Sequence, residues 1–545
     1  MMKTSKLISR EVLAAASFLI LVPLIAHLSF SWMGFTPTDE GFTLANSRRI
    51  LDGQVPHRDF ILIRPFVSPL IHVPFVLFGD NTFWLSRLFV WFQLASISWL
   101  WVSIINRMMK FPFSVANKVL ISLICFAASV HTKHITAWNT IDGLFFIAIG
   151  LALAIRNRPA AKLVGYFLIG LAPLCKQSFV FIPLLSLIIL GDWRRVKCWV
   201  AAASPALYCL VFLALTHALS DAFVQLTSRT ELVSVGLLPY TGKRLMLSVV
   251  VGYLSFWLGL GRSSSIPDQV KKRIAISMIY FAPLLGTAAS LWFDILMDTS
   301  FLLFGFLLGA TIYLLTHNSS PQKAKHVSLL VLLTAWSASL SGGYNSPALV
   351  SGPILVALIA HVFSRYKQNN KLFLQYSLPI ASALILYSFG VARTRYIYRD
   401  KAAGQLTYPL EGVLRGGKHI YTNSNTYEFM YDLKRAVELA ENENKEYTIL
   451  PNVAAYWVES AEENPLPIIW PDEADELKQP AVMKRFIEAM ETKRNSTIFI
   501  VQKVSAASLA KGFLPLEDSE YHNVVGYVRA HFTKFQETNF FELYR

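Results

Sequence analysis

Residues 12–33 read VLAAASFLILVPLIAHLSFSWM and include no lysine, arginine, aspartate or glutamate. At 1.5 Å per residue, a helix of this length crosses the roughly 30 Å hydrocarbon core of a bilayer. Lys3, Lys6 and Arg10 precede the run, and no small-residue cleavage site separates it from a soluble mature domain. The stretch therefore predicts a retained first transmembrane helix and not a signal peptide.

Apolar runs of this kind recur along most of the chain. The 545 residues are 54% hydrophobic and 16% charged, whereas soluble domains carry roughly 25% charged residues. This composition excludes a soluble globular protein and predicts an α-helical polytopic membrane protein with about thirteen transmembrane helices. The further runs lie at residues 82–106, 115–130, 140–156, 161–174, 177–191, 196–218, 245–261, 274–292, 299–316, 327–341, 346–364 and 373–391.

One shorter apolar stretch, Pro65 to Gly79, is interrupted by prolines at positions 65, 69 and 74. Proline removes a backbone donor and disrupts a helix interior, and the stretch is short for a span. We therefore expect an interfacial or re-entrant segment. Counting it as a full span would also break the alternation of basic loops along the chain.

The distribution of charge sets the expected orientation. The net charge is +15, but 22 of the 35 acidic residues follow position 392, which leaves 31 basic and 13 acidic residues before it. The positive-inside rule accounts for this excess, so nucleic-acid binding is not predicted. With a cytoplasmic N-terminus and an odd number of spans, the tail lies on the other side. The cytoplasmic loops would then hold Arg107, Lys110, Arg156, Arg194, Lys271 and Lys323.

We expect two domains, a transmembrane domain of residues 1–392, with a long first outer loop at 34–81, and an extracytoplasmic domain of residues 393–545. In the second, strand-like runs at 448–450 and 497–501 alternate with helical patterns at 427–443 and 481–493, which predicts a small α/β fold. No disulfide framework is expected, because the cysteines all lie in or beside apolar runs, at Cys125, Cys175, Cys198 and Cys209.

Two adjacent carboxylates, Asp39 and Glu40, follow the first span. Carboxylates at a membrane surface are candidates for base or ion chemistry. The structural alternative is a helix over residues 40–51, capped by Thr38 or Asp39 and favoured by acids in its first turn. Both interpretations can hold together.

Basic residues on the outer side are candidates for anion binding. Arg64 directly precedes the proline-interrupted segment, where a guanidinium can bind a phosphate or extend toward the headgroups as an interfacial arginine. Lys176 lies in an outer hairpin, where the positive-inside rule does not favour lysine, and this points to an anion. Arg87, near the outer end of the second span, is expected to have an acidic partner. His57 and Arg58 lie in the same outer loop as Arg64.

Asp142 begins the fourth span, where it is a candidate site residue or a helix cap. His131 and His134 are spaced as metal ligands, but a third ligand of clear spacing is missing, so a metal site is not predicted. The sequence contains no GxxxxGK[ST], HExxH or GxSxG motif and no GxGxxG after a strand. Nucleotide hydrolysis and serine or zinc hydrolysis are therefore not predicted.

From Asp39 onward the chain resembles the glycosyltransferase-C superfamily, in particular lipid A aminoarabinose transferases and protein O-mannosyltransferases. The resemblance rests on DEGFTLANSRRILDGQVP at 39–56, IRPFVSPLIHVPFVLFG at 63–79 and the GxxxxWxxR spacing of Gly79, Trp84 and Arg87. Leu174-Cys175-Lys176-Gln177 is similar to the family's Leu-x-Lys-Gly hairpin, with glutamine in place of glycine. The similarity covers roughly the first 190 residues.

The resemblance implies transfer of a sugar from a polyprenyl phosphate to an acceptor hydroxyl, with inversion, at the outer face of a bacterial inner membrane. It assigns Asp39 as general base and Glu40 as the group that orients either Asp39 or the acceptor. Arg64 and Lys176 would bind the donor phosphate, with Asp142, Arg87, His57 and Arg58 in support. The implied partners are the bilayer, the lipid-linked donor, and a glycolipid, polysaccharide or protein acceptor. A need for a divalent metal stays open.

Two other classes stay open at this stage. A polysaccharide polymerase or O-antigen ligase also uses polyprenyl-linked sugars, although its main outer loop usually lies between later spans. A flippase or transporter of lipid-linked sugars would more often show charges within spans and inverted repeats. A cavity that joins Asp39, Arg64, Asp142 and Lys176 at the outer surface would favour transfer, and a midplane site would favour transport.

Overall fold

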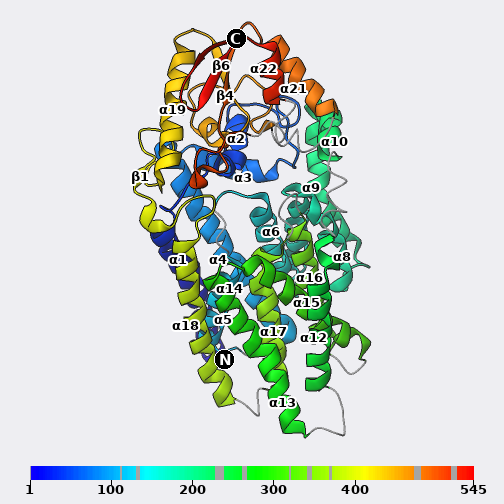
Figure 1. Ribbon diagram of the computed structural model, residues 1–545. Helices are drawn as coiled ribbons and strands as arrows, with labels where there is room; N and C mark the ends of the chain where they lie inside the picture. Colours follow the sequence, from blue (N-terminus) through cyan, green and yellow to red (C-terminus); the bar gives the residue numbers. More distant parts are fainter. Residues whose placement is uncertain are drawn as a thin grey trace.

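The computed structural model describes residues 2–110, 113–130, 135–227, 238–260, 267–317, 321–340, 346–366, 371–471, 480–516 and 524–545. In these residues the chain is mostly helical, with a small sheet near the C-terminus. Figure 1 shows long helices side by side in a bundle, with the C-terminal domain at one end of it. The N-terminus lies toward the opposite end of the bundle.

Each of the thirteen predicted apolar runs is helical over most of its length. The helices of the bundle are α1 (Met2–Phe30), α4 (Thr82–Met109), α5 (Val115–Ser129), α6 (Asn139–Ala154), α7 (Pro159–Leu171), α8 (Phe181–Ile189), α9 (Val196–Leu215), α12 (Lys243–Leu260), α13 (Asp268–Ile276), α14 (Ala282–Trp292), α15 (Leu296–Thr316), α16 (Gln322–Ser339), α17 (Ser351–Tyr366) and α18 (Lys371–Arg395). A π-helical turn, Ser277–Phe281, joins α13 to α14.

Among the described residues, six helical segments are long and apolar enough to cross a membrane. Several such helices in one chain are consistent with a polytopic membrane protein. The count of thirteen spans stays a prediction, because several other apolar helices are shorter than a bilayer crossing. The six segments are Arg10–Phe30, Gly79–Met109, Val196–Leu215, Gln269–Trp292, Leu296–Thr316 and Gln375–Arg395.

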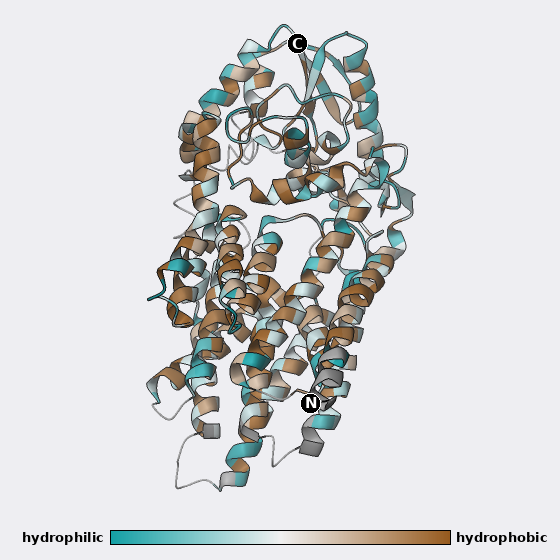
Figure 2. Ribbon diagram, turned by 180° about the vertical axis from the view of Figure 1, so that it is seen from behind, coloured by the Kyte–Doolittle hydropathy of each residue, from teal (hydrophilic) through white to brown (hydrophobic). Residues whose placement is uncertain are grey.

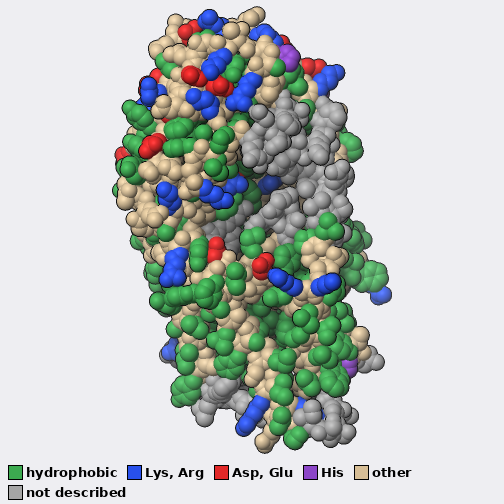
Figure 3. Space-filling view, viewed as in Figure 1, with side chains coloured by type: hydrophobic (Ala, Val, Ile, Leu, Met, Phe, Trp, Pro, Cys, Tyr) green, Lys and Arg blue, Asp and Glu red, His purple; other side chains and the backbone are tan. Residues whose placement is uncertain are grey.

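Hydropathy divides the molecule along its length. Figure 2 shows hydrophobic residues throughout the bundle and more hydrophilic ones in the C-terminal domain. In the space-filling view of Figure 3, charged side chains gather on the C-terminal domain, and hydrophobic side chains cover much of the helical part. Exposed leucines and valines on α9, such as Leu207, Leu210 and Val211, agree with a surface that faces lipid.

Two short helices, α2 (Asp39–Leu51) and α3 (Val67–Val76), lie between the bundle and the C-terminal domain (Figure 1). Helix α2 packs tightly on the 3₁₀ turn Ala454–Val458. A Cβ atom added to Gly41 would lie 2.1 Å from the Ala455 backbone nitrogen, and that nitrogen donates to the Pro37 carbonyl at 2.9 Å. The absence of a side chain at position 41 therefore lets the first outer loop contact the C-terminal domain.

The C-terminal domain has a four-stranded sheet in the order β3–β4–β6–β5. Strands β3 (Glu446–Leu450) and β4 (Thr497–Gln502) are parallel, and β6 (Phe541–Tyr544) pairs antiparallel with β4 and with β5 (Lys534–Glu537). Ile498 and Ile500 pack with α19 (Ser424–Glu441), whereas Phe499 and Val501 pack with α21 (Pro480–Thr492) and α22 (Val524–His531). Because successive side chains of β4 point to opposite faces of the sheet, helices pack on both faces and form an α/β/α sandwich.

The local predictions for the outer loop have different outcomes. Helix α2 confirms the predicted helix, and α3 is a short helix within the proline-interrupted segment. Thr38 occupies the predicted N-cap position, but its side chain makes no capping hydrogen bond to α2. Instead, its hydroxyl accepts from Arg399 at 2.9 Å and lies 2.9 Å from the Thr36 hydroxyl. The Thr38 hydroxyl therefore makes tertiary contacts in place of the local capping hydrogen bond that the sequence pattern predicts.

Candidate functional site

Asp39 is the first residue of α2 and is 4% exposed. Its carboxylate lies 3.5 Å from the Arg399 guanidinium and accepts a hydrogen bond from the Tyr398 phenol. Burial and the charge of Asp39 raise the pKa of Tyr398, so the phenol keeps its proton and donates. The buried carboxylate therefore has a cationic and a neutral partner, both from the segment that follows α18.

Asp400 fixes that segment against the first outer loop. Its carboxylate accepts from the Phe35 backbone at 2.9 Å, from the Lys401 backbone at 2.7 Å, from Thr422 at 2.8 Å and from Asn423 at 2.6 Å. Burial raises the pKa of Asp400, although these donors oppose the shift. Since Arg399 and Asp400 are adjacent, this network sets the position of the guanidinium beside Asp39.

Glu40 forms a bidentate ion pair with Arg87. Arg87 Nε donates to Glu40 Oε1 at 3.0 Å and Nη2 donates to Oε2 at 2.8 Å. The same guanidinium donates to the carbonyls of Ser31 at 2.5 Å and Gly34 at 2.7 Å. Both residues are 1% exposed, and burial raises the pKa of Glu40 while Arg87 lowers it. Glu40 is the acidic partner expected for Arg87, and the pair joins α2 to α4.

Arg64 lies close to the start of α2. Its guanidinium carbon is 5.2 Å from the ring centre of Phe42 and 5.2 Å from that of Trp138. Nη1 donates to the Asn139 side chain at 2.6 Å. Phe42 is three residues after Asp39 and hence on the same side of α2. The cation is thus held on the aromatic faces of Phe42 and Trp138, and Phe42 belongs to the helix that Asp39 begins.

Lys176 lies in the turn between α7 and α8, and this turn contacts the residue before Arg64. The Gln177 amide donates to the carbonyl of Ile63, the residue before Arg64, at 2.8 Å. Lys176 is 6% exposed, and its ammonium donates to the Ala338 carbonyl at 2.9 Å. The turn that carries the buried Lys176 therefore contacts the residue before the half-buried Arg64.

Asp142 is fully buried within a polar cluster behind this region. It is the fourth residue of α6 and does not cap that helix, which begins after Trp138. His72 Nε2 lies 3.0 Å from Asp142 Oδ1, and Gln93 donates to the same oxygen at 2.8 Å. The Ser68 hydroxyl donates to Oδ2. Asp142 therefore joins α3, α4 and α6, which favours a structural role over contact with a substrate.

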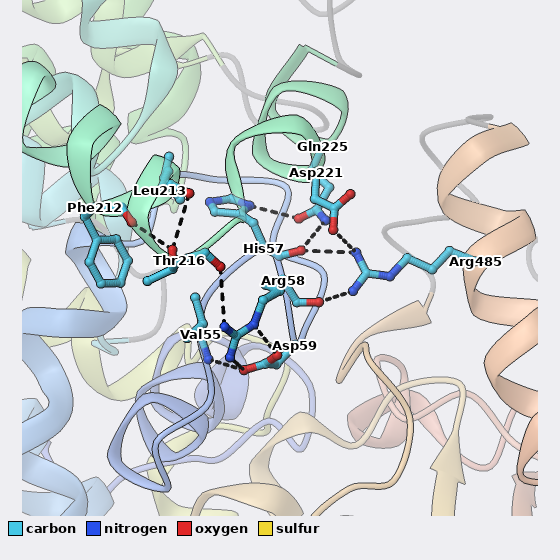
Figure 4. A network of polar contacts seen from close by, with 10 residues as sticks. All are labelled: Val55, His57, Arg58, Asp59, Phe212, Leu213, Thr216, Asp221, Gln225 and Arg485. Carbon is cyan, nitrogen blue, oxygen red and sulfur yellow. Dashed lines mark hydrogen bonds and ion pairs between the residues drawn. The ribbon is translucent and has the colours of Figure 1, made fainter.

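His57 and Arg58 belong to a separate network (Figure 4). His57 Nδ1 lies 2.8 Å from Gln225 Oε1, and Arg485 donates to the His57 carbonyl at 3.1 Å. Arg58 pairs with Asp59 at 2.8 Å. Burial lowers the pKa of the His57 imidazole, so the ring is neutral at pH 7. These contacts hold residues 55–59 against α10 (Leu219–Thr227) and α21, and they do not include Asp39 or Arg64.

The structure thus brings four predicted elements together around the start of α2, namely Asp39, the Glu40–Arg87 pair, Arg64 and the Lys176 turn. Sequence reasoning missed Tyr398 and Arg399. Their signal was the run RTRYIYRD at 393–400, a dense aromatic and basic segment at the C-terminal end of the last apolar run. The contact with Asp39 could not be predicted, because the two segments are far apart in the sequence.

The described residues include no group of three or more His, Cys, Asp or Glu side chains that could hold a metal ion. His131 and His134 lie outside the described residues. In the described part of the chain, the donors gathered around Asp39 are a phenol and a guanidinium. The two cations of this region, Arg64 and Lys176, are suited to bind an anion.

Comparisons of the chain with protein-family models, with curated proteins and with solved structures found no match.

Proposed function

We propose that this protein is a membrane glycosyltransferase that moves a sugar from a polyprenyl phosphate to an acceptor hydroxyl. In this proposal the bundle spans the membrane with about thirteen helices and a cytoplasmic N-terminus. The C-terminal domain lies outside the cytoplasm, at a bacterial inner membrane. The positions of the two termini toward opposite ends of the molecule support an odd number of spans.

The observation that carries the proposal is that one helix, α2, holds both Asp39 and the aromatic ring on which Arg64 stacks. A buried carboxylate begins α2, and a guanidinium stacks on Phe42, three residues later. Helix α2 lies between the apolar bundle and the hydrophilic C-terminal domain (Figure 1). A lipid-linked phosphate needs this arrangement, because its chain requires an apolar surrounding and its sugar an aqueous one.

The residues have complementary roles in the proposed reaction. The acceptor oxygen attacks the anomeric carbon while the bond from that carbon to the phosphate oxygen breaks. The Asp39 carboxylate takes the proton of the acceptor hydroxyl, and a single displacement inverts the anomeric centre. Polyprenyl phosphate leaves, and Arg64 with Lys176 stabilises its charge. Arg399 and Tyr398 position Asp39, and the Glu40–Arg87 pair holds the start of α2.

A transfer assay on the purified full-length protein tests the proposal. Radiolabelled polyprenyl-phosphate sugars are incubated with a membrane lipid extract, and label in the acceptor fraction is counted. The transfer rate of the Asp39→Asn variant is expected to be about 10²–10⁴-fold lower than that of the wild type, the range typical of a lost general base. The matched control is Asp52→Asn, at the other end of α2, where Asp52 pairs with Arg48.

Two outcomes contradict the proposal. Near wild-type transfer by Asp39→Asn, at equal protein abundance, removes Asp39 as the base. Movement of an intact lipid-linked sugar across proteoliposomes, without label in any acceptor, indicates a flippase. Equal loss in both variants shows a general effect on α2 and not chemistry at position 39.

A further inference from the structure

A cavity of about 430 Å³ opens at the junction between the C-terminal domain and the first outer loop. Its lining comes from α19, from the start of β3, from residues 411–418, and from the segment around Glu459. Asp80, from the loop between α3 and α4, completes it, and the Asp80 carbonyl accepts from the Lys418 backbone at 3.1 Å. The volume is within the usual range of ligand sites, roughly 300–1,000 Å³.

The base of the cavity is apolar and aromatic. Val413, Leu414 and Val437 contribute buried side chains. The buried Tyr447 ring stacks on Trp457, with 5.9 Å between centroids and 26° between planes. Its hydroxyl lies 2.6 Å from that of Tyr456, which also lines the cavity. A ligand at this base would meet an aliphatic surface and phenolic oxygens together.

The rim carries charges of both signs. Five carboxylates line the cavity, from Asp80, Glu411, Glu438, Glu441 and Glu459, together with the cations of Arg415, Lys418 and Lys434. A polyanion would meet the carboxylates and a polycation would meet the basic residues, so neither is favoured. Hydroxyl groups both donate to carboxylates and accept from ammonium and guanidinium groups. The lining therefore suits a neutral, polyhydroxylated ligand with apolar faces.

A smaller cavity of about 100 Å³ continues beside the first. Ser460 and Ala461 line both cavities. Trp457 lines the smaller one, and its buried indole nitrogen has no hydrogen-bond partner among the described residues. Arg48, near the C-terminal end of α2, also lines the smaller cavity. The two cavities thus lead from the C-terminal domain to the C-terminal half of α2, the helix that begins at Asp39.

From these features we propose that the larger cavity is a subsite for an oligosaccharide, the glycan portion of the acceptor. This inference rests on the proposed function, since the acceptor of a glycosyltransferase must be held near the base. It narrows the acceptor to a molecule that already carries sugars, and it places those sugars on the C-terminal domain.

Saturation-transfer NMR on the full-length protein in nanodiscs tests the subsite without turnover. The probes are neutral trisaccharides of glucose, N-acetylglucosamine and mannose, each at millimolar concentration. Ala461→Trp places an indole in the opening of the cavity from an exposed position. Ala481→Trp, an exposed position of α21 that lines neither cavity, is the matched control.

We expect at least one trisaccharide to give a saturation-transfer signal with the wild type and with Ala481→Trp, and to lose at least 80% of it with Ala461→Trp. No signal from any probe, or equal signals from both variants, overturns the subsite. Binding without transfer in the radiolabel assay contradicts the proposed function and leaves the subsite standing. If the Ala461→Trp variant binds the trisaccharides and transfers sugar as the wild type does, the subsite is contradicted and the proposed function is not.

Discussion

Asp39 and Glu40 are neighbours in the chain, but their surroundings assign them different roles. Both oxygens of Glu40 are occupied by Arg87 in a buried ion pair, whereas Asp39 has the partly exposed Arg399 at a longer distance of 3.5 Å. A carboxylate in a bidentate buried pair is unsuited to take a proton, because it would leave a buried cation unpaired. At the residue scale, the structure therefore gives the two adjacent acids different surroundings.

This distinction predicts a loss of stability when Glu40 is neutralised. Glu40→Gln leaves Arg87 buried beside a neutral amide, and breaking one partner of a buried pair costs about 3–5 kcal/mol. Thermal unfolding in detergent should show a clear fall in Tm. The double variant Glu40→Leu with Arg87→Met should recover part of that loss. If the stability change of the double variant equals the sum of the changes of its two single variants, the two side chains do not interact as an ion pair.

Glu459 provides a prediction about pH. Burial raises the pKa of this carboxyl above its usual 4.5, although Thr82 and Arg48 oppose the shift. Because the folded-state pKa exceeds the unfolded one, the contribution of Glu459 to stability is complete below about pH 4.5 and is lost as pH rises through the folded pKa. Glu459→Gln should remove this part of the pH dependence of Tm. Glu428→Gln, on α19, is the control, and parallel curves for wild type and Glu459→Gln would contradict the assignment.

At the scale of elements, the sequence predicted α2, the apolar helices and the strands β3 and β4, because their patterns are local. It did not predict the true environment of Thr38, since the Arg399 contact comes from a distant segment. It also did not show that α2 lies under the C-terminal domain. The close approach at Gly41 shows why a glycine occurs within that helix despite its low helix propensity.

The close backbone contact at Gly41 predicts that Gly41→Ala weakens the junction between α2 and the C-terminal domain. The added Cβ would lie 2.1 Å from a backbone nitrogen, which cannot move away as a flexible side chain could. Overpacking of this kind costs about 1–3 kcal/mol. Limited proteolysis of the C-terminal domain should become faster. Gly526→Ala in α22, where an added Cβ meets nothing within 4 Å, should leave the rate unchanged or lower it.

For the whole molecule, composition and apolar run length predicted a membrane protein with a separate α/β domain. Those properties follow from the thickness of a bilayer and from strand and helix periodicity. The candidate site was predicted in part, because Asp39, Arg64 and Lys176 lie in segments with unusual charge for their position. The separation of His57 and Arg58 from the site, and the burial of Asp142, follow from how α3, α10 and α21 pack. No local pattern encodes that packing.

The most direct test of the central claim is a structure of the full-length protein with a phosphonate analogue of a polyprenyl-phosphate sugar, which cannot be cleaved. The account predicts the phosphonate within about 3 Å of the Arg64 guanidinium, with the anomeric carbon facing Asp39 across a space that fits an acceptor hydroxyl. Binding near the middle of the bundle, away from α2, would contradict transfer at Asp39 and favour transport.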